Sequence, residues 1–313
     1  MDLPLPIRKI AIPTPYEVGD VNIYLWEEEP LTLIDAGPPT KKAKDTLVAS
    51  LSKLGYDIKD VKRVILTHSH PDHSGLAPFL KESGASIALH KDDVSLFKNL
   101  KSGNILNTCI LIGLDKSVAE LVAQYYAEMP FSTFSIDVDR YLNDGDHIHS
   151  TGTDFEVIHC PGHSPGSISL YNSDTRCLIS GDTLLKEITP NALFSWEVQN
   201  NRGLKLYKST LNNLLNYDLE LVLPGHGDNL EGKEIKDRIR DILDHHEDRG
   251  KKIKKILENK KMTIFQISTE LFGDLPISEV PLSIFEVSGH LEILVERNLI
   301  ESTEEAGTLF FSA

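Results

Sequence analysis

The chain has 313 residues, a length that suits one large domain joined to a smaller one. Its 47 acidic and 32 basic side chains give a formal charge of −15, which argues against a general nucleic-acid binder because it repels phosphate backbones. Three scattered cysteines argue against a disulfide framework, and no apolar run is long enough for a signal peptide or a membrane span. We therefore expect a cytoplasmic protein without a membrane segment.

The first part of the chain combines short strands with helices. A helix is expected at 41–54, where apolar residues have helical spacing and Gly55 supplies a stop signal. The other elements expected here are strands at 21–26, 31–35, 61–66 and 87–89 and a helix at 76–82. The acidic turn 27–30 between the first two strands indicates an antiparallel start. Strands and helices then alternate, as in mixed α/β proteins.

Residues 94–139 interrupt this alternation. They include a helical stretch at 118–129, whereas a compact α/β layout needs only a short crossover at this point. We interpret 94–139 as an insertion or a lid. Four short apolar segments follow it, each ending near a turn that contains glycine, and we expect strands at 155–159, 167–171, 176–180 and 219–223.

The last part of the chain changes character. A large domain is expected over 1–230, followed by a charged linker helix at 231–250 and a small domain at 251–313. Within the small domain, helical patterns are expected at 253–257, 264–272 and 284–295, with β-prone pieces around 299 and 309–311. Three helices and a terminal hairpin indicate a winged-helix-like domain.

The most informative segment is T-H-S-H-P-D-H-S-G at 67–75, directly after an expected buried strand. Loops at strand ends commonly carry functional residues. His68 and His70 are two residues apart, so both side chains can point the same way and reach one metal ion. Asp72 and His73 lie where a helix begins and can serve a second ion nearby. Imidazole and carboxylate groups are ligands that zinc accepts.

Three further candidate ligands follow later strands. They are His163 in C-P-G-H-S-P-G, Asp182 in S-G-D-T and His226 in L-P-G-H-G. Each has a glycine close by, which permits a tight turn and leaves room for an ion. A single histidine is more often a core or surface residue than a ligand. Seven ligand-type residues at predicted strand ends are hard to obtain by chance, so we expect one metal site where these strand ends converge.

The remaining histidines have simpler interpretations. His90, His147, His149 and His159 lie in or beside expected strands, where structural or solvent-facing roles predominate. His245 and His246 fall in the charged linker helix and are expected on its exposed face. The lysine-rich run 251–255 is likewise expected to be a solvated helix face.

These segments closely resemble the metallo-β-lactamase superfamily over about residues 16–230. Its signature H-x-H-x-D-H matches 68–73, and I-D-A-G at 34–37 is similar to its strand and turn near the site. The resemblance implies an αββα sandwich with two metal ions at one edge of its two sheets. It further implies that His68, His70 and His163 hold the first ion, that Asp72, His73 and His226 hold the second, and that Asp182 bridges both.

The sequence also departs from particular branches of that family. The best-known antibiotic-degrading enzymes have a cysteine where Asp182 stands, so β-lactam hydrolysis is not the expected role. Asp182 instead resembles the glyoxalase II-like and nuclease-like branches. Glyoxalase II itself is disfavoured, because the lysine and tyrosine pattern that grips glutathione does not follow Asp182.

Charge indicates the chemistry of such a site. Two zinc ions, balanced by Asp72, Asp182 and a bridging hydroxide, leave a net charge of about +1, which favours an anionic or strongly polarised substrate. A metal-bound water loses its proton near pH ~7, so hydroxide is available to attack a carbonyl carbon or a phosphorus atom. Asp72 is also the expected catalytic residue, since it can accept a proton as the intermediate collapses.

Three function classes remain open at this point. The favoured one is a dinuclear zinc-dependent hydrolase of a small-molecule ester, thioester or lactone. One alternative is a phosphodiesterase or endoribonuclease acting on single-stranded RNA, although the expected reader helix 281–298 is acidic. The other is an iron-dependent oxidoreductase, and iron or manganese are the alternative metals. We expect the tail to be a packing or homodimerisation module in preference to a DNA reader.

Overall fold

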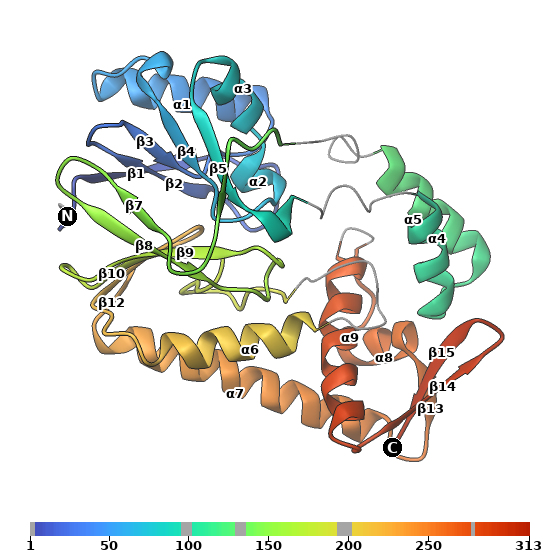
Figure 1. Ribbon diagram of the computed structural model, residues 1–313. Coiled ribbons are helices and arrows are strands. Elements are labelled where there is room, and N and C mark those ends of the chain that lie inside the picture. Colours follow the sequence, from blue (N-terminus) through green and yellow to red (C-terminus); the bar gives the residue numbers. More distant parts are fainter. Residues whose placement is uncertain (1–3, 95–101, 129–135, 193–201, 277–278) are drawn as a thin grey trace.

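The structure is a computed structural model that describes the chain except for residues 1–3, 95–101, 129–135, 193–201 and 277–278 (Figure 1). Two six-stranded sheets form its centre. The first contains β1 (Ile7–Ile12), β2 (Val21–Trp26), β3 (Thr32–Ile34), β4 (Arg63–Ile65), β5 (Ser86–His90) and β6 (Arg140–Leu142), in that order. The second contains β12 (Leu230–Glu231), β11 (Leu221–Pro224), β10 (Cys177–Gly181), β9 (Ile168–Asn172), β8 (Asp154–His159) and β7 (His147–His149), in that order.

The directions of the strands determine which strand ends lie at the same edge of each sheet. In the first sheet β1, β2 and β3 run antiparallel, whereas β3, β4, β5 and β6 run parallel, with Ile34 opposite Ile65. The second sheet is antiparallel except for the parallel pair β10 and β11, which sets Gly181 beside Pro224. Because parallel strands end at the same edge of a sheet, the loops after β10 and β11 start side by side.

The two sheets pack face to face through a shared apolar core. Tyr24, Trp26 and Ile65 of the first sheet belong to one cluster with Phe155 and Leu170 of the second. The ring centroids of Trp26 and Phe155 lie 5.0 Å apart in an edge-to-face arrangement. This geometry is favourable for aromatic pairs beyond the area that they bury.

Helices cover the outer face of each sheet (Figure 1). α1 (Lys41–Lys53) and α3 (Ala77–Glu82) pack on the first sheet, and α6 (Gly203–Leu214) and α7 (Lys233–Ile256) pack on the second. α1 shows why: Ala43, Leu47 and Leu51 recur every four residues and are buried, and Thr40 caps the helix by accepting the Ala43 N–H. The four layers confirm the αββα sandwich that the resemblance implies.

α7 is longer than expected. The helix continues through Gly250 to Ile256, so the segment 253–257, which the sequence predicts as a separate helix, is its last turns. The packing of α9 against α7 accounts for this continuity, since Ile253 beyond Gly250 is buried in one cluster with Val287 and Leu291 of α9. Tertiary contacts here outweigh a helix cost of about 1 kcal/mol for glycine.

The C-terminal part contains α8 (Ile264–Phe272), α9 (Val280–Glu296) and a three-stranded sheet. That sheet is formed by β13 (Lys261–Thr263), β15 (Thr308–Ser312) and β14 (Glu301–Glu305), in that order. Both helices and the terminal hairpin were expected, whereas β13 was not. The winged-helix assignment itself stays a prediction.

The insertion at 94–139 lies partly outside the described residues. Its described part forms α4 (Ser102–Leu111) and α5 (Lys116–Glu128), and α5 corresponds to the helix predicted at 118–129, apart from Met129, which is not described. Ile105 and Cys109 share a buried cluster with Ile267 and Leu291 of the tail. Figure 1 shows these helices beside α8 and β15, so the insertion and the tail form one packed unit. No helix among the described residues is long and apolar enough to cross a membrane.

Candidate metal centre

Four of the seven candidate ligands lie just after β4. His68 and His70 occupy the loop that leaves this strand, and Pro71 begins the short helix α2 (Pro71–Ser74). Asp72 and His73 therefore lie inside a helical turn. Proline favours the first helical position because its fixed φ suits a helix and no N–H is lost there.

The other three ligands come from the second sheet. His163 lies in the loop between β8 and β9, Asp182 directly follows β10, and His226 follows β11. His226 also forms an isolated antiparallel bridge with Val21, the first residue of β2, which ties the two sheets together at this point. Both sheets thus contribute ligands from neighbouring loops.

All seven side chains converge. The closest approaches are 3.0 Å between His68 Nε2 and His70 Nδ1, and 3.3 Å between His226 Nε2 and Asp72 Oδ2. Asp182 is central: its carboxylate oxygens lie 3.3 Å from His73 Nε2, 3.6 Å from His163 Nε2 and 3.7 Å from His226 Nε2. Three overlapping groups have ligand atoms within 4.8 Å of one another: His68, His70 and His163; His68, His73 and Asp182; and Asp72, His73 and His226.

Several of these atoms have no hydrogen-bond partner. The Nε2 atoms of His73, His163 and His226 and Oδ1 of Asp182 are buried and make no hydrogen bond within the described chain. Leaving a buried polar group unsatisfied costs about 1–3 kcal/mol. Zinc bonds of about 2.0–2.2 Å in a tetrahedral arrangement place neighbouring ligand atoms ~3.3 Å apart, close to the spacings observed. The residues present therefore fit metal ions.

In three of these histidines the other ring nitrogen, Nδ1, makes a hydrogen bond. Nδ1 of His163 bonds to the carbonyl oxygen of Asn191 at 2.9 Å, and Nδ1 of His226 bonds to that of Asp20 at 2.9 Å. Nδ1 of His73 lies 2.8 Å from a carboxylate oxygen of Asp35. Each contact fixes a tautomer in which Nε2 points into the centre, an arrangement typical of metal-ligating histidines.

Asp35 joins β3 to this site. It accepts hydrogen bonds from the backbone N–H and the hydroxyl of Thr67, at 2.8 and 2.9 Å, in addition to its contact with His73. Its φ of 64° is a left-handed conformation that residues other than glycine rarely adopt. The I-D-A-G motif indicated a turn near the site, and the structure shows what its aspartate contacts.

Sequence reasoning missed Asp93. This fully buried carboxylate follows β5 and accepts hydrogen bonds from Ser69 N–H at 2.7 Å, Ser164 Oγ at 2.9 Å and Gly166 N–H at 2.5 Å. It thereby connects the His68–His70 loop to the loop that carries His163. Burial raises the pKa of Asp93, against the lowering effect of these bonds. Its position at the end of a parallel strand was the available signal.

The glycine beside His226 is required by close packing. A Cβ on Gly225 would lie 2.3 Å from Asp182 Oδ1 and 2.7 Å from His73 Cε1. Any larger residue would therefore displace two candidate ligands. Gly225 thus leaves room for the side chains of Asp182 and His73.

Burial and neighbouring charges shift the pKa values of several of these side chains. Burial, together with neighbouring histidines, holds the pKa of His68 well below its usual value and lowers that of His70 to about 3. Burial alone would raise the pKa of Asp182, but His73 and His226 outweigh it and hold this pKa well below the usual value. Burial would lower the pKa of His73, yet Asp182 and Asp35 raise it well above 6.5, so a bound metal would displace a proton there.

The other histidines fall into two groups. His147 and His149 contact Asp154 at 2.6 and 2.8 Å on the outer hairpin, and the His90 and His159 rings stack with centroids 4.1 Å apart. These observations agree with structural or solvent-facing roles. The prediction for His246 was wrong, because only 1% of this residue is exposed. The side of α7 that carries it packs against the tail.

Comparisons with known proteins agree with this geometry. The sequence model described as metallo-beta-lactamase superfamily matches residues 16–226. The chain is 29% identical to a protein of Bacillus subtilis named probable metallo-hydrolase YqjP, over 96% of each chain. It is 22% identical to the beta-lactamase-like protein 2 homolog of Caenorhabditis elegans, over 84% of this chain and 75% of that one.

Solved structures share the whole fold, including the tail. A metallo-beta-lactamase family protein from Thermus thermophilus has a TM-score of 0.84 at 24% identity, over 99% of each chain. A beta-lactamase domain protein from Burkholderia ambifaria has a TM-score of 0.87 at 24% identity, over 100% of this chain and 93% of that one. The chain belongs to the metallo-beta-lactamase superfamily and is a metallo-hydrolase of that superfamily.

Proposed function

We propose that the protein is a dinuclear metal-dependent hydrolase that acts on a small-molecule ester, thioester or lactone. The observation that carries this proposal is the convergence of seven ligand-type side chains, four of whose buried atoms make no hydrogen bond to any described residue. Asp182 is the carboxylate at the middle of this arrangement, because it lies within 4 Å of His73, His163 and His226. A site for a single ion would not need so many ligands.

Each residue has a proposed role. His68, His70 and His163 hold the first ion, Asp72, His73 and His226 hold the second, and Asp182 bridges the two. Bound metal ions would supply Lewis acidity and bring the pKa of water to about 7. Asp72 is the proposed proton carrier, since its carboxylate Oδ2 lies beside His226 Nε2 and the neighbouring charge of His73 lowers its pKa against the effect of burial. Asp35 orients His73 through Nδ1.

Two observations support a small substrate over a nucleic acid. The chain carries a formal charge of −15. The helix expected to act as a reader, α9, is buried over much of its length, including Ile284, Val287 and Leu291, and it contacts α6, α7 and α8. A helix that reads a groove must instead present an exposed and preferably basic face.

Zinc is the proposed metal, because it accepts the imidazoles and carboxylates of this ligand set. Iron or manganese would accept the same ligands. Metal analysis of the protein as isolated from cells distinguishes them: two zinc ions associated with the seven-residue site support the proposal, whereas iron would favour oxidoreductase chemistry.

Hydrolysis is tested with zinc-loaded protein and a panel of acyl thioesters, lactones and carboxylic esters, with a short single-stranded RNA in parallel. We expect turnover of at least one acyl substrate and its loss in Asp182→Asn and His68→Ala. His147→Ala is the matched control, since this exposed histidine pairs with Asp154 outside the site. Cleavage of the RNA with no acyl turnover would instead identify a phosphodiesterase.

A further inference from the structure

A second cluster of ligand-type residues lies where the tail meets the sandwich. It consists of His246 on α7 and of Glu286 and His290, which are four residues apart on α9. His246 and His290 are 1% and 3% exposed, and the Glu286 side chain is 9% exposed. Side chains at i and i+4 lie on one face of a helix, so Glu286 and His290 approach α7 together.

The distances within this cluster match a metal site. Glu286 Oε1 lies 3.2 Å from His290 Nε2 and 3.7 Å from His246 Nδ1, and one ligand atom from each residue lies within 4.8 Å of the others. Ligands at about 2.0–2.2 Å from a tetrahedral zinc ion are ~3.3 Å apart. Shifts of a few tenths of an ångström would bring the contacts to Glu286 to that spacing.

His246 gives the independent indication of a ligand. Both of its ring nitrogens are buried, and neither makes a hydrogen bond within the described chain. Burial lowers the pKa of His246 to about 4. Glu286, which contacts both histidines, supplies the carboxylate of the cluster.

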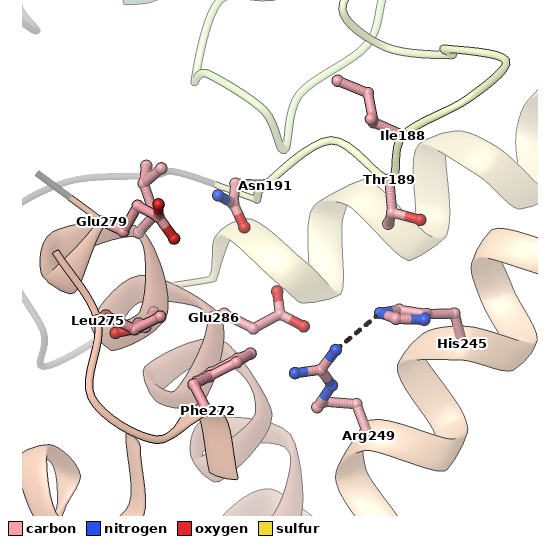
Figure 2. Close-up of a pocket in the computed structure, with 11 residues that line it drawn as sticks. Ile188, Thr189, Asn191, His245, Arg249, Phe272, Leu275, Glu279 and Glu286 are labelled. Carbon is pink, nitrogen blue, oxygen red and sulfur yellow. Dashed lines mark hydrogen bonds between the residues drawn. The ribbon is translucent and has the colours of Figure 1, made fainter. Parts of the chain in front are cut away.

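The cluster has a route to solvent. Glu286 lines a cavity of about 390 Å³, together with Thr189 and Asn191 and with His245 and Arg249 of α7. Figure 2 shows the Glu286 carboxylate extending from α9 into this space, toward His245 and Arg249. An ion can therefore enter from the cavity, where water can supply a fourth ligand. The positive charges of Arg249 and Lys208 act on this cluster and weaken its affinity for a cation.

We propose that His246, Glu286 and His290 bind a third divalent ion of the zinc class, separate from the seven-residue site, which fastens α9 to α7. The ion would satisfy a buried nitrogen of His246 and balance the buried charge of Glu286. Its role is structural, because the three ligands come from helix surfaces at the junction of the tail and the sandwich. On the sandwich side of this junction, Tyr207 of α6 packs edge-on against His246, with ring centroids 6.0 Å apart.

Metal stoichiometry tests the proposal. Each protein is stripped with a chelator, dialysed against Zn²⁺ and analysed for bound metal. We expect three equivalents in the unmodified chain, one in a His68→Ala, Asp182→Asn double variant, and none when Glu286→Gln or His290→Gln is added to that double variant. His245→Gln is the matched control, because it is the neighbouring histidine on α7 and lines the same cavity; it should retain the ion.

A second measurement needs no change in the cluster. In the His68→Ala, Asp182→Asn background, added Zn²⁺ should raise the unfolding temperature, and added Co²⁺ should give the visible absorption of a tetrahedral site. Failure to bind either ion in this background, or retention of the ion in Glu286→Gln, overturns the proposal. A third ion without acyl hydrolysis would reject only the proposed function, and hydrolysis with two ions would reject only this site.

Discussion

At the scale of single residues, Asp93 shows how a carboxylate outside the ligand set can control it. It is fully buried and holds Ser69 of one ligand loop and Ser164 and Gly166 of another. We expect Asp93→Asn to lower the free energy of unfolding by about 2–4 kcal/mol, since hydrogen bonds to charged groups contribute ~1.5–3 kcal/mol each and the new amide donor would face an N–H. Urea unfolding of metal-free protein measures this loss.

The same variant should weaken zinc binding roughly 10- to 100-fold, the effect typical of partners that orient metal ligands. Asp92→Asn is the matched control, because 46% of this neighbouring side chain is exposed. Equal losses in both variants, or unchanged zinc affinity in Asp93→Asn, would show that Asp93 does not position the loops.

The sequence predicted the convergence of the candidate ligands better than it predicted the residues that contact them. The H-x-H-x-D-H motif places four ligand-type residues within six consecutive positions, a pattern that rarely arises without a metal site. Asp93 belongs to an ordinary acidic pair, and its importance arises from loops that are distant in sequence. For His246 a local signal did exist, because Ile235, Ile239 and Ile242 form a buried stripe whose helical spacing continues to His246.

At the scale of elements, α4 and α5 depend on the tail for their packing. The N–H of Phe265 donates to the carbonyl of Ile112 at 3.0 Å, and a Cβ on Gly113 would lie 2.5 Å from the Thr263 side chain. We expect Gly113→Ala to destabilise the protein by roughly 2–5 kcal/mol, because it adds overpacking to the cost of a left-handed backbone. Thr263 also caps α8 through the Gln266 N–H, so its displacement would affect that helix.

Gly55→Ala isolates the backbone contribution. Gly55 follows α1 with φ +91°, close to the +95° of Gly113, but a Cβ there would meet nothing within 4 Å. This variant should cost only about 1–2 kcal/mol. Denaturant unfolding of both variants compares them, and equal losses would mean that the contact between Gly113 and Thr263 adds nothing.

Most strands and helices were predictable from periodicity, but their partners were not. The predicted strand 61–66 and helix 264–272 correspond to β4 and α8. By contrast β13 has only three residues and gives a weak pattern. α6 was missed although Leu204, Tyr207, Leu211 and Leu214 recur at helical spacing. The junction of α4 and α5 with the tail joins residues more than a hundred positions apart, which no local pattern encodes.

At the scale of the whole molecule, the candidate metal ligands come from both sheets. His68, His70, Asp72 and His73 follow β4 of the first sheet, whereas His163, Asp182 and His226 come from the second. The αββα layering was predicted through the family resemblance, since layered sheets could not be derived from strand patterns alone. That layering places loops from both sheets at one edge, so metal ions bound there would stabilise the sandwich as a unit.

Removal of metal should therefore lower the stability of the entire sandwich. Chelator-treated protein is expected to unfold at a lower temperature, and added Zn²⁺ should restore stability in proportion to the logarithm of its concentration, by about 2.7 kcal/mol when free zinc is 100 times its Kd. Calorimetry at several Zn²⁺ concentrations measures this dependence. The gain should shrink in Asp182→Asn, which loses the central carboxylate but keeps His246, Glu286 and His290. If neither the chelator nor added zinc changes the unfolding temperature, the converging side chains hold no ion in the folded state.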